Sequence, residues 1–433
     1  MVKKLLCAGL LGVLSCIVYA AEPAGFDVSK CTVTGKTEQN KFVYAPGEEM
    51  VFLIDFNAGD QTVPEGKYTF QINRRGDDGK FETKKYPLDK MPAQIRFSTS
   101  TQTNSFVHIH ASIRDEKGVK VGKYQQVFEG GAGVGIDLLR PAGTEPADFD
   151  SFWAKQKKRL AEVPLRAERK LVSKPGAKVL VYAAKIDCAG PRPVTGYLTI
   201  PANAKEKSLH AQVNYHGYGT GVQKAPGNGP QNKITFSVNA HGYDLDATPE
   251  YYKEFFGKIK SNGKGYALDP KQNSDPETAY FNGMALRVMR SLEYIKTLPE
   301  WNGKTLTVAG GSQGGLQTMW AAALDKDVTH AMPAVTWCCD LAGHNKAKRL
   351  PGWRPSYVPA LDYYDSIFHA RRIKCRVDIT RAGLGDYVCP PSGLAACYNE
   401  LKCPKSILWV QASNHGYVQK GAQRFKISSE DKK

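Results

Sequence analysis

Beyond its first twenty residues, this chain of 433 residues lacks any hydrophobic run long enough to span a membrane as a helix. It has no Cys-x-x-Cys pair with matching histidine spacing, which argues against a structural zinc site. The glycine-rich run 130–135 is not followed by Lys-Ser/Thr, so it is not a phosphate-binding loop. No recognition helix or RNA-binding motif accompanies the net charge of +17, so no nucleic-acid partner is expected.

The composition indicates a globular protein, with 42% hydrophobic and 23% charged residues. Its length allows two domains, or one large domain with an appendage. The lysines are spread along the chain. Two uses of the positive charge therefore stay open, attraction to an acidic polysaccharide or cell surface and simple solubility.

Residues 1–20 have the pattern of a secretory signal peptide. Lys3 and Lys4 precede a mostly apolar run, and small residues surround Ala20 at the expected cleavage site. The run is short for a membrane anchor, and Val13-Leu-Ser-Cys16 imperfectly resembles a lipoprotein cleavage box. We expect an exported protein that is periplasmic, extracellular or held at the outer surface by a lipid on Cys16.

Eight of the ten cysteines lie beyond the predicted signal peptide, and an oxidising compartment permits disulfides among them. The four between Cys375 and Cys403 are close in sequence, which favours one bridge among them. The pairing cannot be read from the sequence.

Residues 24–137 are predicted to form a small immunoglobulin-like β-sandwich. Short segments that alternate apolar and polar residues are separated by turn signals, as in such domains. The expected strands are 51–56, 67–72, 93–97, 105–113 and 124–128. His108 and His110 share one strand face, which we interpret as solvated, and 130–135 reads as a hinge-like linker.

Residues 138–425 are predicted to form an α/β-hydrolase domain with a doubly wound, mostly parallel sheet. Expected strands alternate with helices over this range. The strands are 179–184, 194–200, 211–215, 234–240, 306–309, 375–380 and 406–410, and the helices are 148–160, 279–297 and 316–324. Four rings between Tyr251 and Phe256 allow two interpretations, a sugar-stacking face or an amphipathic helix packed inward.

Gly310-Gly-Ser312-Gln-Gly314 fits the G-x-S-x-G nucleophile elbow. An apolar run precedes it and a helical run follows it, which is the context this motif requires. The alternative is an ordinary glycine-rich turn. We expect Ser312 to be the nucleophile of a serine hydrolase.

A serine nucleophile needs a base, and the base needs an acid behind it. On this fold the acid follows the serine in the chain and the histidine comes last. Asp386 lies just past the expected strand 375–380, and His415 is the only histidine after it. Asp386 is therefore preferred as the acid over Asp362, Asp365 and Asp378.

The oxyanion of the tetrahedral intermediate needs two main-chain N–H donors. The residue after the nucleophile, Gln313, supplies one of them. A second is expected from the glycine-rich loop that follows strand 211–215, through the N–H of Tyr218. No metal or organic cofactor is needed for this chemistry.

Residues 145–420 resemble the acetyl xylan esterase and cephalosporin-C deacetylase family, carbohydrate esterase family seven. The matching segments are Pro146–Trp153, Tyr215–Gly219, Gly310–Gly315, Gly383–Asp386 with Cys389–Ser392, and Asn414-His415. The resemblance implies the same triad of Ser312, Asp386 and His415, with the amides of Tyr218 and Gln313 as the oxyanion hole. It also implies that the substrate is an acetylated xylan or xylo-oligosaccharide.

Three features depart from the family pattern. The chain has Asn239-Ala-His-Gly242 in place of Arg-Gly-Gln-Gly, His415-Gly416 in place of His-Glu, and the additional sandwich. The acyl group, the sugar and the oligomeric state are left open. Two other functions stay open too, a non-catalytic glycan-binding surface protein and a secreted serine peptidase on the same fold.

Overall fold

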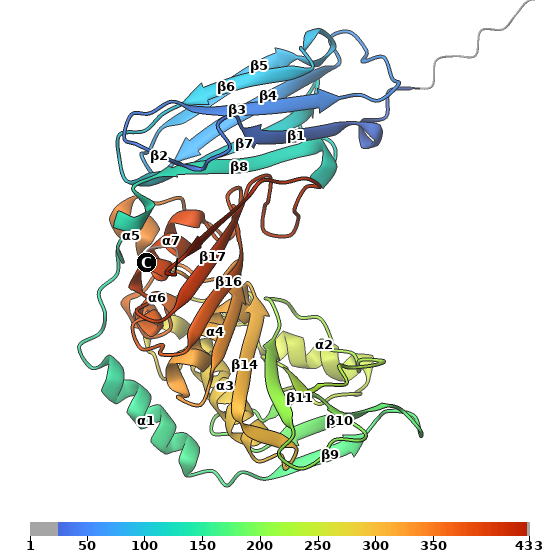
Figure 1. Cartoon of the computed structure of the whole chain (residues 1–433), viewed down its shortest axis with the longest axis vertical. Helices are drawn as coiled ribbons and strands as arrows, with labels where there is room; N and C mark the ends of the chain where they lie inside the picture. Colours follow the sequence, from blue (N-terminus) through green and yellow to red (C-terminus); the bar gives the residue numbers. More distant parts are fainter. Residues whose placement is uncertain (1–24, 431–433) are drawn as a thin grey trace, which may run out of the picture.

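The computed structural model describes residues 25–430. The predicted signal peptide and Cys16 lie outside these residues. Strands and helices form two lobes, a sandwich and an α/β lobe below it (Figure 1). Within residues 25–430, no helix has both the length and the hydropathy needed to cross a membrane.

Two sheets form the sandwich and pack their apolar faces together. One contains β1 (Thr32–Thr37), β3 (Met50–Asn57) and β6 (Gln94–Thr99), in the order β1-β3-β6. The other has the order β2-β8-β7-β4-β5, with β2 (Val43–Tyr44), β4 (Tyr68–Gly76), β5 (Phe81–Pro87), β7 (Ser105–Asp115) and β8 (Val127–Val134). Short 3₁₀ helices lie at Val28–Lys30, Leu88–Lys90 and Tyr124–Gln126.

Alternation along β7 decides which side chains enter the sandwich core. Val107, Ile109 and Ala111 are buried between the two sheets, and the intervening residues point the other way because successive strand residues face opposite sides. That other face is covered by the α/β lobe, and His108 is only 5% exposed. The expectation of a solvated histidine face was therefore wrong, because it treated the sandwich as free on that side.

The α/β lobe is built on a ten-stranded sheet. In spatial order its strands are β18 (Arg424–Ser428), β17 (Lys405–Val410), β16 (Arg376–Gly383), β15 (His330–Ala334), β14 (Trp301–Gly311), β12 (Leu209–Tyr215), β13 (Lys233–Val238), β11 (Val194–Pro201), β10 (Val179–Ile186) and β9 (Ala167–Leu171). The strands from β13 to β17 run parallel, and the outer ones pair antiparallel. The predicted fold class is confirmed.

The helices of this lobe are α1 (Phe149–Ala161), α2 (Pro249–Lys258), α3 (Tyr280–Lys296), α4 (Gln313–Leu324), α5 (Gly343–Ala347), α6 (Ser366–Ala370) and α7 (Pro391–Glu400), with 3₁₀ turns at Ile136–Leu138, Gln272–Ser274 and Pro359–Tyr363. In α3, Met284, Val288 and Leu292 recur at helical spacing and are fully buried. Helix α2 packs Tyr252 against Tyr243. The inward-packing interpretation of 251–256 is thus confirmed.

The two lobes share a tight interface. The predicted linker 130–135 lies mostly within strand β8. A Cβ at Gly131 would come within 2.5 Å of Val107 O and 2.6 Å of Leu384 O, so the missing side chain allows this close approach. The linker interpretation was wrong, because the glycines serve strand packing. The proposed domain boundaries stay a prediction.

All eight cysteines of the described residues are free thiols, so the bridge expected among the four cysteines of segment 375–403 is not formed. Cys389 and Cys397 are buried. Burial raises the pKa of the Cys389 thiol, and a hydrogen bond with Cys339 together with burial raises that of Cys397. Buried thiols with raised pKa behave as packing groups.

Candidate active site

Ser312 lies at the turn between β14 and α4. Its φ of 58° and ψ of −120° are strained for a residue with a side chain, as expected of a nucleophile elbow. A Cβ on Gly314 would lie 2.1 Å from Tyr215 O, and one on Gly310 would lie 2.6 Å from the same oxygen. The two glycines therefore let strand and helix approach closely enough to make this turn.

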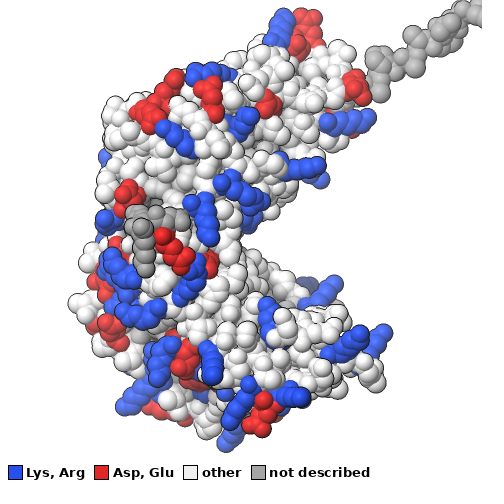
Figure 2. Space-filling view, in the orientation of Figure 1, with Lys and Arg blue, Asp and Glu red and all other residues white. Residues whose placement is uncertain are grey.

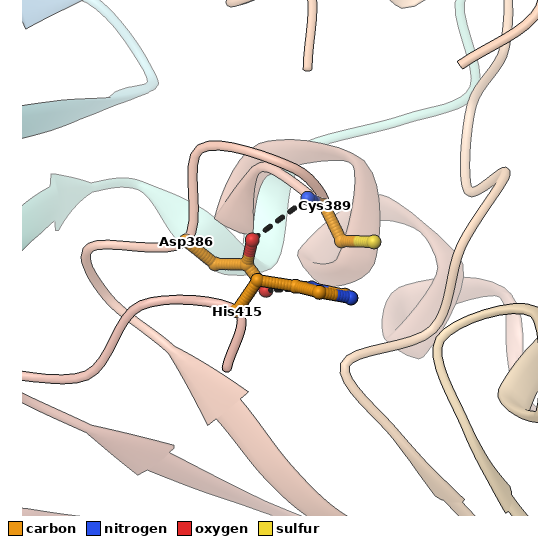
Figure 3. A group of neighbouring side chains, drawn as sticks. All are labelled: Asp386, Cys389 and His415. Atoms are coloured by element: carbon orange, nitrogen blue, oxygen red, sulfur yellow. Dashed lines mark hydrogen bonds and ion pairs between the residues drawn. The ribbon is translucent and has the colours of Figure 1, made fainter. Parts of the chain in front are cut away.

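Asp386 and His415 are in direct contact. The Nδ1 of His415 lies 2.9 Å from Oδ2 of Asp386, and the other carboxylate oxygen accepts the N–H groups of Val388 and Cys389, both at 2.8 Å. Figure 3 shows the imidazole beside the carboxylate. Asp386 is only 3% exposed, and its oxygens are fixed by three N–H donors. This geometry can orient an imidazole and stabilise its cation.

The other three aspartates considered from the sequence are engaged elsewhere. Asp378 pairs with His330 and Arg376. Asp365 accepts main-chain N–H groups, and Asp362 accepts from the hydroxyl of Tyr357. Within residues 25–430, the carboxylate that accepts a hydrogen bond from the imidazole of His415 is that of Asp386.

Ser312 follows β14, Asp386 follows β16, and His415 follows β17, so all three lie beyond the carboxyl ends of parallel strands. Hydrogen bonds link the turns across this edge. Ser312 N donates to Ala334 O at 2.9 Å, Val335 N to Arg381 O at 2.8 Å, and Arg381 Nη2 to His415 O at 2.7 Å. No direct hydrogen bond joins Ser312 to His415 among the described residues.

The glycine-rich loop after β12 lies beside the nucleophile turn. A Cβ built on Gly217 would be 3.8 Å from Ser312 Cβ, so the loop is in contact with the elbow. The Tyr218 ring stacks on Tyr266 at 4.1 Å and meets Trp353 edge-on at 4.7 Å. These rings fix the side chain of Tyr218 and therefore the position of its main-chain N–H.

Two residues that sequence reasoning missed hold this loop from behind. The hydroxyl of Tyr266 accepts Gly219 N at 2.9 Å and donates to Gln313 Oε1 at 2.8 Å. His241 Nε2 donates to Gly219 O at 2.9 Å. Burial lowers the His241 pKa to about 3, so the ring is neutral. Position 241 was noted only as a departure from the family pattern.

The sandwich also contributes residues beside the site. Glu129 Oε2 on β8 accepts Asn414 Nδ2 at 2.5 Å, and Asn414 Oδ1 accepts the N–H groups of Gly416 and Tyr417. These bonds shape the turn that carries His415. Gln411 in the same loop bonds Gly131 at both its N–H and its C=O, each at 2.8 Å. Contacts between residues about 285 positions apart leave no sequence signal.

Asp386, Cys389 and His415 each place a possible metal-ligand atom within 4.8 Å of the others. However, both carboxylate oxygens already accept N–H groups. Burial also raises the pKa of the Cys389 thiol well above its usual value, whereas a ligand must be the thiolate. The cluster therefore fits an acid–base pair better than a metal site.

Comparison with known proteins agrees with this fold. Two solved acetyl xylan esterases are similar, from Thermoanaerobacterium sp. JW/SL YS485 with TM-score 0.55 and 20% identity, and from Paenibacillus sp. R4 with TM-score 0.52 and 23% identity. They cover 66% and 65% of this chain, and 93% and 94% of their own. The fold is thus that of α/β-hydrolases. A family model that matches residues 135–348 and 354–429 also makes the chain a carboxylic-ester hydrolase.

The sequence narrows this class to one family. Residues 135–348 and 354–429 match the family model "Acetyl xylan esterase (AXE1)", and the chain belongs to that family. The curated acetyl esterase Axe7A of Xylanibacter ruminicola is 29% identical over 307 residues, which is 68% of each chain. The predicted family resemblance is confirmed.

Proposed function

We propose that this protein is an exported serine esterase that removes acetyl groups from xylan or xylo-oligosaccharides. The observation that carries the proposal is the Asp386–His415 hydrogen bond, 2.9 Å long, at the sheet edge where Ser312 forms a strained elbow. Carbohydrate esterase activity follows from the family. The serine mechanism, the triad and the location are our inferences.

In the proposed reaction, His415 Nε2 takes the proton of Ser312 as its Oγ attacks the acetyl carbonyl carbon. The tetrahedral intermediate collapses when the imidazolium gives that proton to the departing sugar oxygen. Water, deprotonated by His415, then attacks the acetyl-enzyme and releases acetate. Asp386 keeps the proton on His415 Nδ1 and stabilises the imidazolium.

The intermediate's oxyanion is assigned to the main-chain N–H groups of Tyr218 and Gln313. Gln313 is the first residue of α4, where the helix provides no acceptor for its N–H. The positive end of that helix also favours an anion there. Gly217 contacts the elbow, which brings the next residue of the loop, Tyr218, to the same place.

A hydrogen bond between Ser312 and His415 is expected to form when substrate binds. Catalytic hydrogen bonds are often long in the absence of substrate and tighten in the complex. The strained φ of Ser312 holds its side chain above the sheet edge, where the proposed attack on the substrate takes place.

Acetylated xylan is proposed as the substrate because the curated relative is named an acetyl esterase and the structural neighbours are named acetyl xylan esterases. Export is proposed because residues 1–20 have the three-part pattern of a signal peptide.

The test is acetate release from acetylated xylan by the purified protein, with a peptide amide as the competing substrate. Ser312→Ala is expected to lower the rate by about 10⁴-fold or more, as for other triad serines. Ser208→Ala is the matched control, because Ser208 is exposed and its hydroxyl donates only to Lys205 O among the described residues. Undiminished release by Ser312→Ala, or faster cleavage of the peptide, would contradict the proposal.

A further inference from the structure

A pocket of about 610 Å³ lies between the two lobes, next to the Asp386–His415 pair. Its α/β wall includes Tyr387 and Asn414, the chain neighbours of those two residues. Its sandwich wall comes from β4, β7, β8 and the β7–β8 connection. Figure 2 shows the cleft between the lobes, with Lys and Arg side chains along its sandwich side.

Three cations line this pocket, Arg75, Lys120 and Lys123. All three are exposed, and none has an ion pair with a carboxylate among residues 25–430. His110 lies on the same pocket wall. Burial lowers the pKa of His110 to about 4, and the charges of Lys120, Arg114 and Arg75 lower it too.

One carboxylate, Glu129, lines the same pocket beside these three cations. It is 9% exposed and hydrogen-bonded to Asn414 Nδ2. Burial raises the pKa of Glu129, while its hydrogen bond with Asn414 and the charges of Lys120 and Arg75 lower it. With three cations and one carboxylate on its wall, the pocket is a basic one.

Two tyrosines on this wall leave their rings in solvent. Tyr124 is 55% exposed and stacks on Tyr417 at 5.3 Å, while Tyr387 is 52% exposed. Exposed aromatic faces that also carry a hydroxyl suit ligands with both apolar and polar surfaces, such as sugar rings. Cations beside these rings add recognition of a negative group.

We propose that this pocket binds the carboxylate of a hexuronate unit on the acetylated polysaccharide. The inference deepens the proposed function and rests on it, since it names the class of substrate that the site selects. Binding the acidic unit here places the chain of the polysaccharide beside His415, because Asn414 lines the pocket. The net charge of +17 then steers acidic polysaccharides toward the enzyme.

The test measures binding by calorimetry to the full chain carrying Ser312→Ala, so that the ligand is not consumed. The ligands are a glucuronate-branched xylo-oligosaccharide and the same compound with its carboxyl reduced to the alcohol. We expect the acidic form to bind about tenfold tighter, since each exposed ion pair contributes at most a factor of about five. Added salt should shrink this difference.

The double variant Lys120→Gln, Lys123→Gln should bring the two affinities close to equal. The matched control Lys174→Gln, Lys304→Gln removes two exposed lysines that do not line this pocket, and it should keep the preference. The affinities of an oligogalacturonide and of its carboxyl-reduced form are measured in the same way. This comparison tests whether the pocket binds a hexuronate from another polysaccharide. Preference for either acidic ligand supports the pocket, and preference for neither overturns the inference.

Acetate release from a neutral acetylated xylo-oligosaccharide by the wild-type chain is measured in parallel. Loss of the carboxylate preference with intact release would remove only the pocket assignment. Absence of release with an intact preference would remove the proposed function and leave a binding site for acidic sugars.

Discussion

The two halves of the candidate site are supported by different parts of the molecule. The nucleophile half, Ser312 with the loop at Tyr218, is held by groups of the α/β lobe such as Tyr266 and Ala334. The acid–base half, Asp386 with His415, is supported by the sandwich. Glu129 of the sandwich is hydrogen-bonded to the turn that carries His415 and packs against Gly385. The added lobe is therefore part of the support for the imidazole.

The residues that match the family model also separate the α/β lobe from the sandwich. The match covers 135–348 and 354–429 and leaves out both the sandwich strands and residues 349–353. Leu350 N in that omitted segment donates to Asp77 Oδ1 of the sandwich at 2.8 Å. The family core thus contains both halves of the candidate site, while the support of one half lies outside the matched residues.

The largest expected effect comes from breaking the acid–base half at its centre. Asp386→Asn replaces one acceptor oxygen by a donor, which cannot accept from both His415 and the loop amides. We expect kcat on an acetyl ester to fall by about 10⁴-fold, as when a triad acid loses its charge. Asp378→Asn is the control, and an equal loss there would contradict the assignment.

A smaller effect is expected in the nucleophile half from Tyr266→Phe. This change removes the hydroxyl that joins Gly219 N to the Gln313 side chain. We expect kcat to fall by about tenfold to a hundredfold with KM little changed, which is less than the loss of a direct oxyanion donor. Steady-state kinetics checks it, and a change confined to KM would show that Tyr266 shapes substrate binding instead.

The sandwich's contribution is tested by Glu129→Ala. The variant leaves Asn414 Nδ2 without its acceptor, and we expect kcat to fall by roughly fivefold to tenfold, as for one lost hydrogen bond of about 1 kcal/mol. Glu129→Gln keeps an acceptor oxygen and should restore most of the rate. If neither variant changes kcat, the sandwich does not support the acid–base half.

The last prediction concerns stability rather than rate, because His108 and His241 are both buried. Burial lowers the pKa of His108 and of His241 to about 3, below the unfolded value of about 6.5. The unfolded chain therefore binds more protons in this window, and stability is lost as pH falls from 6.5 toward 3. Each histidine should contribute up to about 1.4 kcal/mol per pH unit, measured by urea unfolding. A free energy of unfolding that is flat over this window would contradict the pKa directions.

Much of this architecture was readable from the sequence because local patterns encode it. The strands expected at 194–200 and 306–309 and the helix expected at 279–297 appear in the structure as β11, β14 and α3. The elbow was also visible, since its glycines are adjacent in the chain. The predictions of a solvated face at His108 and of a linker at 130–135 were wrong because both segments pack against the α/β lobe. The residues of that lobe are far away in the sequence and come near only in the folded chain.

The triad assignment itself depended on chain order rather than on contact. The structure brings Asp386 and His415 together, whereas the meeting of Ser312 with His415 stays a prediction. Supporting groups such as Tyr266 and Glu129 lay beyond sequence reasoning, because a buried hydroxyl or carboxylate has no motif of its own.

The most direct measurement is mass spectrometry of the protein after treatment with a fluorophosphonate, which labels only an activated serine. We predict a single adduct on Ser312 that forms together with loss of acetate release, and much slower labelling in Asp386→Asn. An enzyme that releases acetate while Ser312 stays unlabelled, or that carries the adduct on another residue, would contradict the account.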